Sequence, residues 1–277
     1  MPMRIVVVGA GGRTGRLVVE QLIGAGHQVV ATIRSPRHMA DMVRLGAETV
    51  MLDLDLSTGP DFQAVFKGAD AIVFAAGSAA GESSALDRTG TVKTVRAAAS
   101  AGVRRYLTIS SIGASTGMKL SGQLNNDEMR DYYQQKRAAN KHLRESGLDY
   151  TIVEPGELTD GKPTGKIVIS EAAIDFAAID RADVAAVVTA LIASKRSIGK
   201  AYQLTGGKSP IATAVAEALG EDVVPVKLPA AKAAAKAPAK KAAAKKAPAA
   251  KKAAAKAPAK TAPAKKPAAK KAAAKEK

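Results

Sequence analysis

The sequence predicts an α/β fold in which helices cover both faces of a doubly wound, parallel sheet. Short apolar, β-branched runs alternate with longer stretches of helical periodicity from the first residues onward. Strands that are apolar throughout are typical of a parallel sheet buried on both faces. Because the crossovers between such strands are right-handed, the alternation favours a doubly wound sheet over an all-helical or all-strand domain.

The N-terminal half contributes most of the expected elements. The first strand is Arg4–Val8, which ends at Gly9, and the helix Arg13–Ile23 follows and is closed by Gly24 and Gly26. Further strands are expected at 28–33, 49–52, 71–75, 104–110 and 150–153, with helices near 62–67, 86–100 and 128–145.

Beyond Pro155 the alternation becomes weaker. Strands are expected at 166–170 and 201–204, and helices at 181–193 and 211–219. This stretch is long enough to cap a site but too short for a large second domain, so we expect a small C-terminal substrate lobe. Together these elements predict one folded domain over residues 1–224.

The remaining residues, 225–277, form a segment of low complexity. From Ala231 to Lys277 there are 16 lysines, no arginine and one acid, so this stretch carries +15 of the net charge of +17. Prolines recur ten residues apart and like charges repel, so we expect a disordered basic tail. It resembles the Lys/Ala/Pro-rich extensions of linker histones and of some bacterial nucleoid-associated proteins.

That resemblance implies nonspecific binding of nucleic acid through the tail. Spaced lysines neutralise phosphates, but without arginine or aromatic residues the tail has no means of bidentate base readout or base stacking. The alternative is a solubilising extension with no dedicated partner. The tail lacks the bulky apolar anchors that membrane binding requires.

Several classes of site and location are excluded by composition. The chain has no cysteine, and its three histidines are far apart in sequence, so no metal-ligand spacing is present. We expect no secretory signal, because an apolar strand begins within a few residues of the N-terminus. No apolar run approaches the ~20 residues that span a bilayer. The expected location is the cytoplasm, or the nucleoid if the tail binds DNA.

The glycine-rich segment after the first strand predicts a dinucleotide-binding site. It places glycines where the chain must turn sharply, approach a pyrophosphate closely and enter a helix with free N–H groups. The alternative is a merely tight turn, but the position at the end of the first strand favours a Rossmann-type loop. The segment comprises Gly9, Ala10, Gly11, Gly12, Arg13, Thr14 and Gly15.

The second strand ends at a basic residue, Arg34, where an acidic residue would favour NAD. With Arg13 in the loop nearby, Arg34 favours NADP, whose 2′-phosphate a guanidinium pairs with. Asp53, after the third strand, is placed to reach the adenine edge. Ala76 and Gly77 follow the fourth strand, and their small size allows the cofactor to pass over the sheet.

These segments, in this order, resemble the atypical short-chain dehydrogenases/reductases. The resemblance rests on the glycine loop, Asp53, Ala76-Gly77, Ser110-Ser111 and the stretch 132–136, Tyr-Tyr-Gln-Gln-Lys. The stretch 143–153 is similar to the NAD(P)H-binding branch, which includes biliverdin reductase B-like and NmrA-like proteins. The resemblance covers about residues 3–220 and implies fold and cofactor, whereas the branch mixes reductases, epimerase-like enzymes and non-catalytic redox sensors.

A catalytic group is predicted on the helix near residues 128–145. Tyr132 and Lys136 are four residues apart and therefore lie on one face of that helix. A nearby ammonium favours the phenolate, so Tyr132 is the candidate for proton exchange with a substrate oxygen. Ser111 is the candidate that hydrogen-bonds the same oxygen, with Ser110 as its alternative. Tyr133 is three residues from Lys136, and the family spacing favours Tyr132.

One segment departs from the family pattern. Where relatives commonly have Arg-Pro-Gly after the sixth strand, this chain has Glu154-Pro155-Gly156. The substitution reverses the charge beside the expected substrate pocket, which indicates either a changed substrate preference or a relaxed catalytic constraint.

The leading hypothesis is an NADP-dependent reductase of a small carbonyl, quinone or tetrapyrrole-like compound, with a tail that binds nucleic acid. The alternative is a non-catalytic NADP(H) sensor that associates with DNA. A third hypothesis, a nucleoid protein with a vestigial Rossmann domain, requires that no dinucleotide bind.

Overall fold

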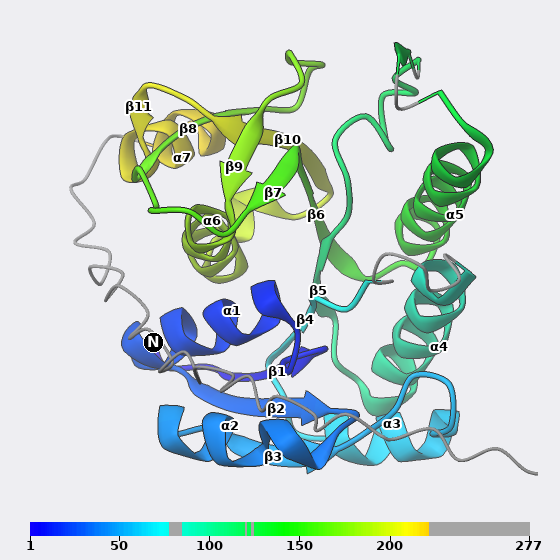
Figure 1. Ribbon diagram of the computed structural model, residues 1–277. Coiled ribbons are helices and arrows are strands. Elements are labelled where there is room, and N and C mark those ends of the chain that lie inside the picture. The colour runs from blue at the N-terminus through cyan, green and yellow to red at the C-terminus, as the bar shows by residue number, and fades with distance from the viewer. Residues whose placement is uncertain (78–84, 120, 123–124, 222–277) are drawn as a thin grey trace, which may run out of the picture. The chain divides into compact units, whose positions relative to one another are not determined.

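A nine-stranded sheet forms the centre of the protein in a computed structural model, which describes residues 1–221 except 78–84, 120, 123 and 124 (Figure 1). The tail expected at 225–277 lies outside the described residues. The strands of the sheet are β1 (Arg4–Val8), β2 (Gln28–Ile33), β3 (Glu48–Met51), β4 (Ala71–Phe74), β5 (Arg105–Ile109), β6 (Asp149–Pro155), β8 (Lys166–Ser170), β10 (Lys200–Gly206) and β11 (Ser209–Pro210).

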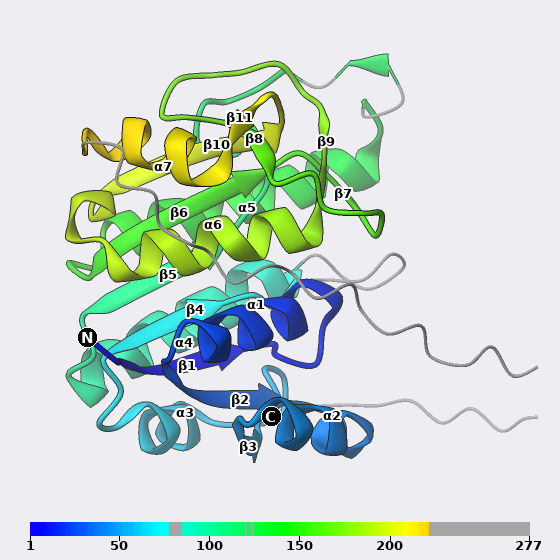
Figure 2. The same cartoon turned by 90° about the vertical axis from the view of Figure 1, so that its left-hand side faces the viewer.

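Helices cover both faces of this sheet, as the apolar strands predict (Figures 1 and 2). One face packs against α1, α2, α6 and α7, and the other against α3, α4 and α5. The helices are α1 (Arg13–Gly24), α2 (Met39–Leu45), α3 (Gly59–Phe66), α4 (Ala85–Ala101), α5 (Asp127–Arg144), α6 (Arg181–Ala193) and α7 (Ile211–Leu219), with short 3₁₀ turns at Pro36–His38 and Lys195–Ser197. No described helix is long and apolar enough to cross a membrane.

The strand order β11-β8-β10-β6-β5-β4-β1-β2-β3 confirms the expected α/β fold with a doubly wound sheet. The neighbouring strands β10, β6, β5, β4, β1, β2 and β3 are parallel to one another. Strand β8 is antiparallel to both β10 and β11. The chain winds outward in opposite directions from β1 and β4. Ligands of such sheets bind at this switch point, beyond the carboxyl ends of the strands.

The residues expected to form a small C-terminal lobe extend the main sheet instead of standing apart from it. Strands β8, β10 and β11 continue the sheet beside β6, and α6 packs against α1. The short strands β7 (Glu157–Thr159) and β9 (Ala178–Asp180) pair in a separate two-stranded ribbon. Only this ribbon and its loops thus resemble the lobe that was expected.

A buried arginine on β5 fixes the far end of α6. The Arg105 guanidinium donates to the backbone oxygens of Leu191 (2.8 Å) and Ile192 (3.2 Å), which are C-terminal carbonyls of α6, and to Ser197 Oγ (2.8 Å). Burial lowers the pKa of Arg105 to about 10, so the side chain remains charged at neutral pH. A cation at a helix C-terminus is favourable, and this contact sets the position of α6 on the sheet.

Candidate functional site

The glycine loop between β1 and α1 is packed so tightly that it has no room for side chains. Gly9 has a φ of +82°, and a Cβ there would lie 2.7 Å from the Ala76 Cα at the end of β4. A Cβ on Gly15 would lie 2.2 Å from the Gly9 oxygen. The Ala10 N–H donates to the Thr32 oxygen (3.0 Å) and ties the loop to β2. The loop therefore lies at the switch point.

The start of α1 has the features of a phosphate-binding helix N-terminus. Gly12 is the N-cap and provides no capping side chain, and the first turn holds no acidic residue. The Gly12 N–H donates to the Gly9 oxygen (3.0 Å), while the Arg16 N–H closes the first helical turn on the Gly12 oxygen (2.9 Å). Thr14 is buried and Arg13 is exposed. Backbone donors and the positive end of the helix dipole fit a pyrophosphate here.

The adenosine side of the expected site carries basic residues. Arg34 directly follows β2 and is exposed. Arg37 Nε donates to His38 Nε2 (3.0 Å), and the His38 ring lies against the loop, because a Cβ on Gly11 would come within 2.7 Å of its Cδ2. The sequence did not indicate that His38 packs against the glycine loop.

Asp53 shapes its own turn after β3. Its Oδ1 accepts the N–H groups of Asp55 (2.8 Å) and Leu56 (3.3 Å). The half-buried carboxylate thereby organises the loop that was expected to meet the adenine edge.

At the carboxyl end of β4, a buried ion pair lies beside Gly77. Lys136 Nζ on α5 lies 2.8 Å from Asp87 Oδ1 on α4, and both side chains are almost fully buried. A Cβ on Gly77 would lie 3.9 Å from this Nζ. Burial alone lowers the pKa of Lys136, but Tyr132 and Asp87 raise it above its ordinary value, so the ammonium remains charged. The residues after Gly77, 78–84, lie outside the described residues.

The two tyrosines of α5 have different partners. Lys136 Nζ lies over the ring of half-buried Tyr132, 5.6 Å from its centroid. Tyr133 is buried and shares a side-chain hydrogen bond with Ser111, and its ring packs edge-on against Tyr132 at 5.5 Å. Burial raises the pKa of Tyr133. Ser110 Oγ is buried and has no hydrogen-bond partner among the described residues. The structure thus groups Lys136 with Tyr132, but Ser111 with Tyr133.

Glu154, the residue that departs from the expected family pattern, lies in a buried polar network. Its carboxylate accepts hydrogen bonds from Asn140 Nδ2 (2.8 Å), from Ser115 Oγ and from Gln203 Nε2. Gln203 Oε1 in turn accepts the Gly113 N–H (2.8 Å). Burial raises the pKa of Glu154, although the hydrogen bonds oppose this shift. Glu154 is fully buried and holds the loop after β5, which carries Ser111, against β6 and β10.

The sequence does not predict three of the charged residues in this region. Asp87 is the partner of Lys136, and Asp160 joins the exposed Arg13 (2.7 Å) to Arg181 (2.8 Å). Each contact joins residues that are distant in sequence, so no local spacing could have revealed it. Among the described residues, no cluster of potential ligands is present that could hold a metal ion.

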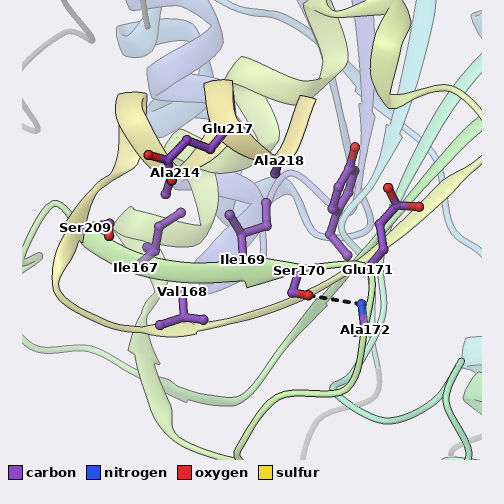
Figure 3. A pocket seen from close by; sticks show the side chains of 11 residues that line it. Ile167, Val168, Ile169, Ser170, Glu171, Ala172, Ser209, Ala214, Glu217 and Ala218 are labelled. Carbon is purple, nitrogen blue, oxygen red and sulfur yellow. Dashed lines mark hydrogen bonds between the residues drawn. The ribbon is translucent and has the colours of Figure 1, made fainter. Parts of the chain in front are cut away.

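A separate cavity of about 470 Å³ lies between β8 and α7 (Figure 3). Its lining includes the apolar side chains of Ile167, Ile169 and Ala214 and the carboxylates of Glu171 and Glu217. None of the sequence-predicted site residues lines this cavity, so it is distinct from the glycine-loop site.

Comparison with known proteins agrees with this site. The NAD(P)H-binding family matches residues 9–195. The "Uncharacterized sugar epimerase YhfK" of Bacillus subtilis is 34% identical over 220 residues, which cover 77% of this chain and 99% of the relative.

Two solved structures share the fold. The "Putative NAD-dependent epimerase/dehydratase from Bacillus halodurans" has a TM-score of 0.70 and 33% identity, covering 78% of this chain and 99% of its own. The oxidoreductase ylbE from Lactococcus lactis has a TM-score of 0.68 and 31% identity, covering 79% and 98%.

Proposed function

This chain belongs to the NAD(P)H-binding family of Rossmann-type oxidoreductases and epimerases, and we propose that it is an NADP-dependent reductase of a small carbonyl, quinone or tetrapyrrole-like compound. The observation that carries the proposal is the position of the buried Lys136–Asp87 pair. The same short segment after β4 touches the glycine loop through Ala76 and this ion pair through Gly77. A nucleotide-binding loop and a cation beside a tyrosine therefore meet at the switch point.

The preference for NADP is supported by the basic residues at the adenosine side. Arg34 follows β2 at the position where an acidic side chain favours NAD, and Arg13 begins α1. A guanidinium pairs well with a phosphate, so these two residues are proposed to recognise the 2′-phosphate.

The proposed roles of the side chains follow from their positions. The bound nicotinamide would supply a hydride to the substrate carbon. Tyr132 donates a proton to the substrate oxygen, and the nearby Lys136 ammonium stabilises the phenolate that remains. Ser111 is proposed to hydrogen-bond the same substrate oxygen, whereas the buried Tyr133 contacts Ser111 and is given no contact with the substrate.

The test compares Tyr132→Phe with Tyr133→Phe in the full chain, by loss of NADPH absorbance against a panel of carbonyl and quinone compounds. Tyr132→Phe is expected to lower turnover by about 10²-fold or more while NADPH affinity is kept, because a proton donor is lost. Tyr133→Phe serves as the matched control and should retain most turnover. Wild-type turnover in Tyr132→Phe would refute the assignment.

Two specific contacts favour the sensor alternative. Asp87 neutralises much of the charge of Lys136, and Ser111 is engaged with Tyr133. A sensor would bind NADPH but turn over no compound of the panel. An epimerase, the activity in the names of the Bacillus relatives, would return the hydride and leave NADPH absorbance unchanged while its substrate isomerises.

For residues 225–277 we propose nonspecific binding of nucleic acid, which is supported by composition alone. If about ten lysines engage DNA, log affinity should fall with log salt at a slope near −9. A slope near zero, or equal binding by the chain without these residues, would contradict the proposal.

A further inference from the structure

One carboxylate joins the first turns of two helices beside the glycine loop. Asp160 follows β7, and its Oδ2 lies 2.7 Å from Arg13 Nη1, while its Oδ1 lies 2.8 Å from Arg181 Nη1. Arg13 is the first residue of α1, and Arg181 is the first residue of α6. These helices pack side by side (Figures 1 and 2).

The two arginines differ in their freedom to leave Asp160. The Arg181 side chain is only 9% exposed, whereas that of Arg13 is 71% exposed. Removing the counter-ion of a buried guanidinium is strongly unfavourable, so Asp160 remains with Arg181. An exposed ion pair contributes little to stability, so Arg13 can exchange Asp160 for another anion at small cost.

The loop that carries Asp160 is held in place without Arg13. Asp183, which is buried in the first turn of α6, accepts the N–H groups of Thr164 (2.9 Å) and Gly165 (3.0 Å). Asp160 is thus anchored from the side of α6, while its outer oxygen faces the start of α1.

We propose that Asp160 is a specificity-determining residue that sets the preference between NADP(H) and NAD(H) by competing with the 2′-phosphate for Arg13. This inference rests on the nucleotide site of the proposed function. NAD(H) has no 2′-phosphate, so release of Arg13 favours NADP(H) selectively. A general effect of negative charge on the pyrophosphate would instead act on both nucleotides alike.

The experiment measures the Kd of NADPH and of NADH by nucleotide fluorescence for full-length wild type, Asp160→Asn and Glu157→Gln. Asn keeps an oxygen that faces Arg181 and removes the charge that holds Arg13. Glu157→Gln is the matched control, because this exposed acid lies three residues away on β7 and its removal changes the net charge equally. Asp160→Asn should lower the Kd of NADPH by about two- to fivefold and change the Kd of NADH little. Glu157→Gln should change neither Kd appreciably.

A second background tests whether the effect passes through Arg13. Arg13→Gln should bind NADPH more weakly than wild type does. Adding Asp160→Asn to this variant should then leave the Kd of NADPH unchanged. If Asp160→Asn fails to fold, Asp160→Asn with Arg181→Met removes the buried charge together with its counter-ion, and the same selective tightening is expected.

The outcomes separate this inference from the proposed function. A wild type that binds NADPH, with Asp160→Asn indistinguishable from it, overturns only the role of Asp160. Equal tightening of NADPH and NADH, tightening in Glu157→Gln, or an effect that persists in Arg13→Gln also overturns it. A wild type that binds neither nucleotide overturns both.

Discussion

Replacing Gly15 by alanine tests whether the glycine loop is a nucleotide site formed by close packing. The added Cβ would lie 2.2 Å from the Gly9 oxygen and 2.9 Å from the Gly9 carbon, both backbone atoms. Ordinary van der Waals contact begins near 3.4 Å. The loop must therefore move by about 1 Å, and overpacking of this kind costs about 1–3 kcal/mol.

The same displacement should weaken nucleotide binding. Hydrogen bonds from backbone N–H groups to a charged phosphate contribute about 1.5–3 kcal/mol each, so the loss of one lowers NADPH affinity by about 10- to 150-fold. For a domain of this size, the packing cost should lower the melting temperature by about 2–10 °C.

The assay combines thermal melting with fluorescence titration of NADPH. Gly59→Ala is the matched control, because Gly59 begins α3 and a Cβ there meets nothing within 4 Å. This control should bind NADPH as wild type does. Its stability should change by no more than about 1 kcal/mol, because the gain from replacing a glycine is offset by the restriction that the following Pro60 places on a helical residue. Wild-type NADPH affinity in Gly15→Ala would show that NADPH does not bind at the closely packed glycine loop.

Two further changes probe the buried charges. Lys136→Met leaves the Asp87 carboxylate buried without its ammonium and should lower the free energy of unfolding, measured by urea denaturation, by about 3–5 kcal/mol. The double variant Lys136→Met/Asp87→Leu should recover most of that loss. A loss well below about 3 kcal/mol in Lys136→Met would contradict the role of the ion pair. Glu154→Gln places an amide donor among the donors of the network and should cost about 1–3 kcal/mol. Because the folded-state pKa of Glu154 is raised above 4.5, wild type loses stability as the pH rises from 4.5 through that pKa, whereas Glu154→Gln does not. The difference in free energy of unfolding between wild type and Glu154→Gln should shrink with rising pH. A difference that widens with pH would refute the raised pKa of Glu154.

Local signals predicted most of the fold. The apolar strands and amphipathic helices were expected within a few residues of their observed bounds, because burial imposes a regular period on each. Helix α2 and strands β7, β9 and β11 were missed. They have only seven, three, three and two residues, which are too few to show a regular period.

The candidate site was predicted in part. The glycine loop could be recognised because its turn and close packing require glycine at fixed local positions. The partners Asp87, Asp160 and Arg181 come from remote segments, and helix spacing could not separate the surroundings of Tyr132 and Tyr133. Glu154 was expected to change the charge beside a pocket, but the structure buries it beneath the loop of Ser111.

The proposed NADP site is tested by the affinity of the purified full-length protein for NADPH and NADH, in wild type and in Arg34→Ala. We expect wild type to bind NADPH more tightly than NADH, and Arg34→Ala to lose that preference by about tenfold or more, because a charge-assisted contact to the 2′-phosphate is removed. Binding of neither nucleotide would contradict the assignment of a dinucleotide site to this domain.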